Sequence, residues 1–147
     1  MTLAKSILIV IGYYIVIVVV ADIAGVLLNT LFDIFAGRSK STLLYYTVWF
    51  VTAIFAGMLY FGLASSTVKV NETFAKNNWI ITLIAIILSM ILFFIFYANG
   101  QMDETNTYYV PGNPYMTYTF FVTFILASIF AQYLDKPYLP NKKIKEV

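Results

Sequence analysis

The sequence contains no cysteine and no histidine. Without cysteine, the chain cannot form disulfides, thiolate metal sites or a cysteine nucleophile. Without histidine, it lacks the commonest metal ligand, the usual axial ligand of haem and the side chain that most often transfers protons near neutral pH. These absences argue against an enzyme, so we expect no catalytic residues, no metal and no cofactor.

Charged residues are also scarce. They make up 11% of the 147 residues, whereas hydrophobic residues make up 61%; an average soluble domain is about 25% charged. A soluble fold of this size leaves too much surface exposed to hide so many apolar side chains. The composition therefore predicts an integral membrane protein, which we expect in the inner (plasma) membrane of a bacterium. The net charge of +2 gives no basis for binding nucleic acid.

Four long apolar stretches predict helices at about residues 6–36, 42–65, 78–98 and 114–134. Each reaches the roughly 20 residues that a helix needs to cross the hydrocarbon core, and none alternates like a barrel strand. We predict an all-α fold, a single four-helix membrane bundle over residues 1–147 with a long first helix. A cleavable signal peptide is the alternative for the first stretch. It fits poorly, because a cut after Ala24 would put Asp22 where cleavage favours a small residue.

The basic residues predict the orientation of the bundle. With four crossings, both termini and the loop of residues 65–78 lie on one side of the membrane, and the other side carries Arg38 and Lys40. The first side holds the remaining seven of the nine basic residues: Lys5, Lys69, Lys76, Lys136, Lys142, Lys143 and Lys145. Because basic residues are enriched in cytoplasmic loops, this bias predicts an N-in, C-in topology with a basic cytoplasmic tail at 135–147.

An aspartate interrupts the first apolar stretch. Helical spacing predicts that six residues share one face: Tyr14, Val18, Asp22, Gly25, Asn29 and Asp33. We expect this face to point into the bundle, with Asp22 near the middle of the membrane and Asp33 near the outer surface. The fourth helix carries Ser128 on its own polar stripe. We therefore predict Asp22, Asn29 and Ser128 as candidate contacts for an ion, a proton or a partner protein.

The state of Asp22 has three interpretations. An ionised aspartate at the centre of a membrane helix costs about 3 kcal/mol or more, and no lysine or arginine lies within the four stretches to neutralise it. Asp22 is then protonated and hydrogen-bonded to a hydroxyl of another helix, or paired with a basic residue of a partner, or placed on a proton or cation pathway. The sequence leaves all three open.

Small residues predict close helix packing. Ala53 and Gly57 lie one turn apart on the second helix, and Gly25 lies on the first. Such residues let helices approach within the chain, on another membrane protein or on a second copy. Together with Asp22, they favour a non-enzymatic membrane protein that acts through helix–helix contacts as an accessory, assembly or immunity-type subunit. The alternative is a small proton- or cation-coupled transporter or channel that uses Asp22.

The longest polar segment between helices is an outer loop of 15–17 residues that joins the third and fourth helices. It carries Tyr108 and Tyr109 beside a predicted tight turn. The loop is either a lid folded on the bundle or a recognition surface for another protein, and these two tyrosines are its candidate contacts.

Overall fold

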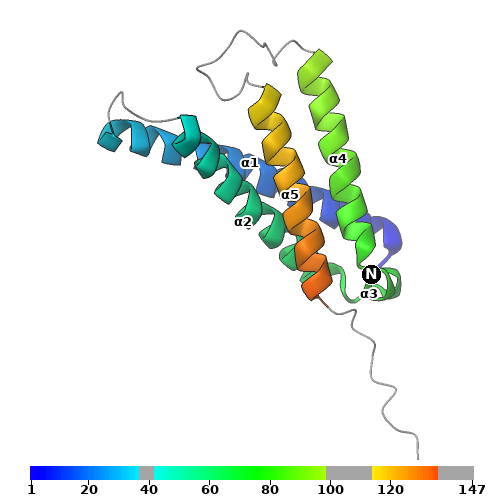
Figure 1. Ribbon diagram of the computed structural model, residues 1–147. Coiled ribbons are helices and arrows are strands. Elements are labelled where there is room, and N and C mark those ends of the chain that lie inside the picture. The colour runs from blue at the N-terminus through cyan, green and yellow to red at the C-terminus, as the bar shows by residue number, and fades with distance from the viewer. Residues whose placement is uncertain (37–41, 99–113, 136–147) are drawn as a thin grey trace, which may run out of the picture.

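The computed structural model describes residues 1–36, 42–98 and 114–135. These residues form helices and turns and contain no strand, which confirms the all-helical prediction. The helices are α1 (Leu3–Ala36), α2 (Thr42–Val68), α3 (Glu72–Lys76), α4 (Trp79–Ala98) and α5 (Pro114–Leu134) (Figure 1). The predicted outer loop, with Tyr108 and Tyr109, and residues 136–147 of the basic tail lie outside the described residues.

Three helical segments are long and apolar enough to cross a membrane, which supports the prediction of a membrane protein. They are Leu3–Phe35, Leu43–Val68 and Thr117–Leu134. The described side chains of α4 form a shorter apolar segment, Trp79–Ile95. None of these segments contains proline, so nothing interrupts their backbone hydrogen bonds.

The short helix α3 is an element that the apolar pattern does not predict. Asn71 precedes it with extended backbone, and its side-chain oxygen accepts a hydrogen bond of 3.0 Å from the amide of Thr73. Glu72 in the first turn and Lys76 in the last turn complement the helix dipole. Because the Phe74 side chain is only 2% exposed, it fixes α3 against the longer helices.

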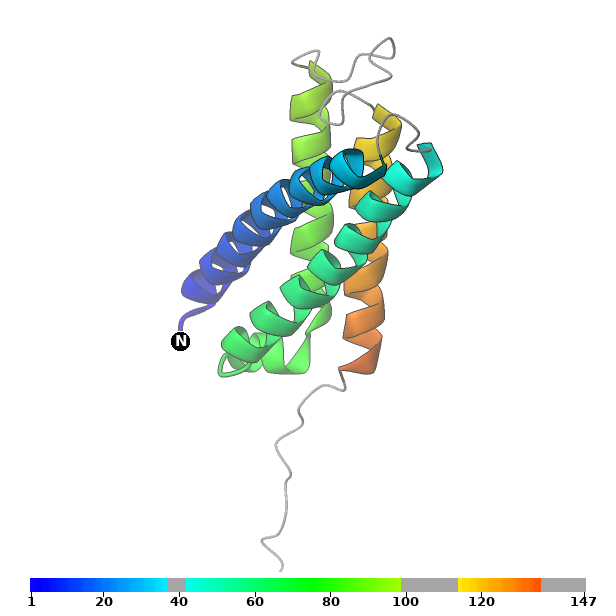
Figure 2. The same ribbon diagram turned by 90° about the vertical axis from the view of Figure 1, so that its left-hand side faces the viewer.

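α2 lies between α1 and α5. It packs extensively along α5 and also along α1, while α4 packs mainly on α5 (Figures 1 and 2). α4 reaches α1 at the N-terminal half of α1, where the Tyr14 and Ser89 hydroxyls meet. The C-terminal half of α1 therefore has α2 as its main neighbour and projects beyond the other helices.

The small residues of α2 bring its backbone close to α5. A Cβ atom added at Gly57 would collide with the backbone carbonyl oxygen of Phe124 and lie 2.9 Å from the Cβ of Ala127. Ala53 and Ala64 on the same side of α2 are fully buried. This close approach explains why, among the described helices, α2 packs most extensively on α5.

The N-terminus, α3 and the end of α5 lie at the same end of the helices (Figure 2). The Asn71 side chain donates a hydrogen bond of 3.0 Å to the carbonyl of Met1. The Asn78 side chain donates one of 3.1 Å to the carbonyl of Asp135. These contacts join residues that are 70 and 57 positions apart in sequence, which fixes this end of the fold.

Candidate functional site

Asp22 lies on the outer side of α1. Its side chain is exposed, as are those of its neighbours Val19, Ile23 and Val26. Across the residues that the structure describes, it makes no hydrogen bond and no ion pair. The expectation that Asp22 points into the bundle is therefore wrong. The carboxylate lies on an exposed apolar flank of α1, beside the side that packs on the other helices.

Helix geometry explains this correction. An α-helix advances 100° per residue, so Asp22 lies about 80° round the axis from the buried Tyr14, whereas Ala21 lies only about 20° away. The buried side of α1 therefore passes through Ala21 and not through Asp22. Tyr14, Ala21 and Gly25 are all buried. Each step of four residues turns the helix by about 40° more than a full turn. Two such steps from Tyr14 therefore place Asp22 outside the interface.

Gly25 and Asn29 stay in the interface between α1 and α2. A Cβ atom at Gly25 would lie 2.6 Å from the ring of Trp49, so the glycine makes room for the indole. Trp49 in turn packs edge-to-face on Phe120 of α5, with ring centroids 6.1 Å apart. Asn29 is 4% exposed, one turn beyond Gly25. This part of the predicted stripe is a packing seam, and Asp22 lies beside it.

Ser128 lies far from Asp22. It is fully buried on α5, one turn beyond Phe124, whose ring packs 5.6 Å from that of Tyr14. Asp22 lies two turns beyond Tyr14 on α1 and is exposed, whereas Ser128 is enclosed by the other helices. The structure thus does not bring Asp22, Asn29 and Ser128 together into one site.

The centre of the fold holds a polar pair that sequence reasoning missed. The Tyr14 hydroxyl lies 2.7 Å from the Ser89 hydroxyl of α4. The Tyr60 ring of α2 packs edge-to-face on Tyr14 at 5.8 Å, and its hydroxyl donates a 2.8 Å hydrogen bond to the carbonyl of Ile81. Both tyrosines are buried. The signal was present, since Ser89 shares a helix face with Thr82, but a single sequence does not pair such residues.

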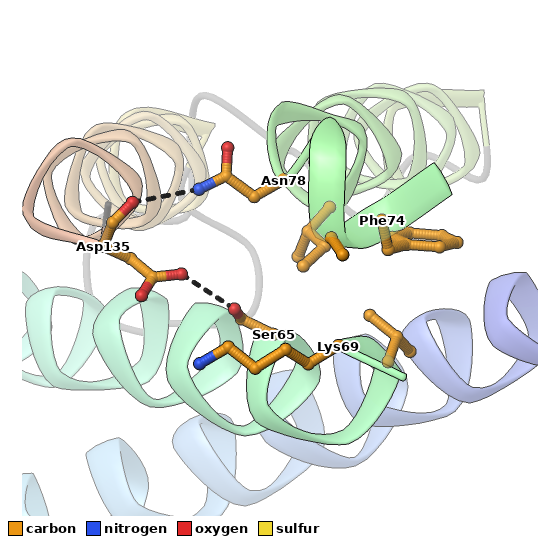
Figure 3. Close-up of a pocket in the computed structure, with 8 residues that line it drawn as sticks. Ser65, Lys69, Phe74, Asn78 and Asp135 are labelled. Carbon is orange, nitrogen blue, oxygen red and sulfur yellow. Dashed lines mark hydrogen bonds between the residues drawn. The ribbon is translucent and has the colours of Figure 1, made fainter. Parts of the chain in front are cut away.

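A small pocket lies at the end of the fold that contains the N-terminus. Asp135, directly after α5, points between α2 and α4, and one of its carboxylate oxygens accepts a 2.9 Å hydrogen bond from Ser65 (Figure 3). Asn78 binds the Asp135 backbone carbonyl, and Lys69 and Phe74 line the same pocket. The Asp135 carboxylate occupies this pocket itself, and the hydrogen bonds of Asp135 join the end of α5 to α2 and to the start of α4. We call this set of contacts the clasp.

The described residues contain no group of three or more acidic, histidine or cysteine side chains that could hold a metal ion. On the surface of α3, Lys76 and Glu72 form an ion pair at 3.9 Å. The features that the described residues do present are helix packing, hydrogen bonds between helices and the exposed Asp22 carboxylate on α1.

Comparison with known proteins adds no further assignment. No protein-family model matches the chain, and no curated protein or solved structure matches it either. The class of protein rests on the molecule itself, an all-helical chain with three helices long and apolar enough to span a membrane.

Proposed function

We propose that this chain is a non-enzymatic integral membrane protein that acts through helix–helix contacts with another membrane protein, as an accessory, assembly or immunity-type subunit. One observation carries the proposal: Asp22 is exposed on the outer side of a membrane-length helix and has no partner in the part of the chain that the structure describes. Polar groups within a membrane helix that face outward are costly in lipid, and a protein partner removes that cost.

The exposed surface of α1 supports the proposal. In its most apolar 18-residue window only 17% of the residues are buried, compared with 50% in α2. Between Asp22 and Phe35, Gly25 and Asn29 are the two buried positions. Gly57 of α2 is already packed against α5. The outer side of the C-terminal half of α1 therefore offers an extended exposed surface for a partner.

The membrane arrangement is part of the proposal. We infer that α4, at 20 residues, also crosses the membrane, which gives a four-helix bundle with the N-terminus, α3 and the end of α5 on one side. The excess of lysine on that side supports a cytoplasmic location for it, and a bacterial inner membrane suits such a bundle. Labelling of a cysteine placed at Gln101 from the outside tests this arrangement; labelling from the cytoplasm alone contradicts it.

Site-specific photocrosslinking in native membranes tests the proposed contact. A benzophenone side chain at Ile23 or Leu27, both exposed on α1, should form an adduct of one discrete mass with a second protein. The same group at Leu126, exposed on α5, is the matched control and should yield lipid adducts. If Ile23 and Leu27 also yield lipid adducts alone, the chain does not act through this surface.

A further inference from the structure

We propose that Asp22 forms an ion pair with a lysine or arginine in a transmembrane helix of a different protein, and that the outer side of α1 is the docking surface for that helix. The inference rests on the proposed function and names the chemistry of the partner. It is drawn from three observations: the position of the carboxylate, the hydrogen bonds of the nearby polar side chains, and the distribution of basic residues in the chain.

The carboxylate lies where a neighbouring helix would reach it. Asp22 is bordered on the exposed surface by Val19, Ile23 and Val26, which form the apolar contact that a transmembrane helix needs. Ala24 nearby is small and only partly buried, so a second helix can approach α1 closely there. An apolar helix with one basic residue at the depth of Asp22 complements this surface in both shape and charge.

Three threonine hydroxyls on α1 and α2 are already engaged. Thr30 of α1 donates to the carbonyl of Val26 at 2.9 Å. On α2, Thr47 donates to Leu43 at 2.8 Å and Thr52 donates to Val48 at 2.8 Å. All three hydroxyls satisfy carbonyls of their own helices, so none of them is committed to the Asp22 carboxylate. Among the described residues no donor to this carboxylate is seen, so a donor from a partner helix would satisfy it.

A second copy of this chain lacks that donor. The stretch from Ser6 to Ala36 contains no lysine or arginine, and neither do α2, α4 and α5. The nearest basic residues along the sequence, Lys5 and Arg38, are 17 and 16 positions from Asp22, or roughly 24 Å or more along a helix. Two copies joined through this surface would bring two carboxylates together. The charge pattern therefore points to a different protein.

Model helices test the chemistry of the partner directly. The full-length purified protein, labelled with a fluorescent donor, is reconstituted in phosphatidylcholine vesicles with an acceptor-labelled single-span Leu/Ala helix. The helix carries lysine, leucine or glutamate at its centre. We expect energy transfer to the lysine helix at an acceptor density at least tenfold lower than to the leucine or glutamate helix. The Asp22→Asn variant should lose this preference.

The Asp33→Asn variant is the matched control, because Asp33 is an exposed carboxylate on the same helix three turns away. It should keep the preference for the lysine helix. Circular dichroism of both variants must match that of the wild type, so that a loss of energy transfer reports the carboxylate and not the fold.

Two results overturn the inference. The first is equal association of the lysine and leucine helices with the wild-type protein. The second is a lysine preference that survives Asp22→Asn. Either result, combined with discrete crosslinks from Ile23 and Leu27 in native membranes, leaves the proposed function standing and removes the ion pair. Absence of those crosslinks refutes the proposed function itself, whatever the model helices show.

Discussion

The hydroxyl of Tyr14 on α1 lies 2.7 Å from the hydroxyl of Ser89 on α4. Both side chains are at most 2% exposed, so the contact is a buried hydrogen bond between two helices that otherwise touch little. It fixes the N-terminal half of α1 on the bundle. The C-terminal half of α1 diverges from α4 (Figure 1) and carries the exposed Asp22.

Replacing Tyr14 with phenylalanine should destabilise the protein by about 0.5–2 kcal/mol, because it leaves the Ser89 hydroxyl buried without its partner. The Tyr13→Phe variant is the control. Its hydroxyl lies 3.0 Å from that of Thr67 in a partly buried position, where water or lipid headgroups replace a lost bond. Unfolding in mixed micelles measures both; equal losses of stability would contradict the central role of Tyr14.

Gly57→Ala should destabilise the protein by about 1–3 kcal/mol, because the added Cβ meets the Phe124 carbonyl, which a side-chain rotation cannot move. Gly62→Ala is the matched control on the same helix, since a Cβ at Gly62 has no atom within 4 Å. That variant should be neutral or up to about 1 kcal/mol more stable. A Gly57→Ala protein as stable as Gly62→Ala would show that α2 and α5 are farther apart than described.

Gly25→Ala should displace the Trp49 ring, which a Cβ at Gly25 would approach to 2.6 Å. Trp49 is 4% exposed, and the second tryptophan, Trp79, is exposed at 51%. In a Trp79→Phe background, the fluorescence maximum of Trp49 should therefore shift with Gly25→Ala. Gly12→Ala, which meets no atom within 4 Å, should leave it unchanged. An identical spectrum in both variants would argue against this seam.

The clasp at Asp135 should show coupling between its two partners. Ser65→Ala and Asp135→Ala each remove the 2.9 Å hydrogen bond between them. The double variant should therefore lose about 0.5–1.5 kcal/mol less stability than the sum of the two single variants. Additive losses would mean that the two side chains do not interact.

Helix content was readable from the sequence because it depends on local properties, the length of the apolar runs and the lack of proline within them. The direction of Asp22 was not, because it depends on how α1 drifts against its neighbours, about 20° in every seven residues. Counting from Tyr14 in steps of four puts Asp22 in the interface, whereas contact with α2 selects Ala21 and Gly25. The partners of a buried hydroxyl such as Ser89 likewise require the tertiary arrangement.

The short helix α3 was not predicted from the sequence for a different reason. Its five residues are too few to give an apolar period, and the burial of Phe74 depends on the longer helices around it. The local signal was the Asn71 cap followed by Glu72, which is typical of a helix start. Such signals identify a short helix only when the surrounding fold supplies its contacts.

The outward position of Asp22 is the central claim, and spin labelling tests it most directly. Since the chain has no cysteine, single cysteines at Ala21, Asp22 and Ile23 each give one defined label in lipid vesicles. We predict that labels at 22 and 23 are mobile and collide with dissolved oxygen, while the label at 21 is immobile and shielded. A label at 22 that is as shielded as the label at 21, or that collides with a water-soluble nickel complex as in bulk solvent, would contradict the claim.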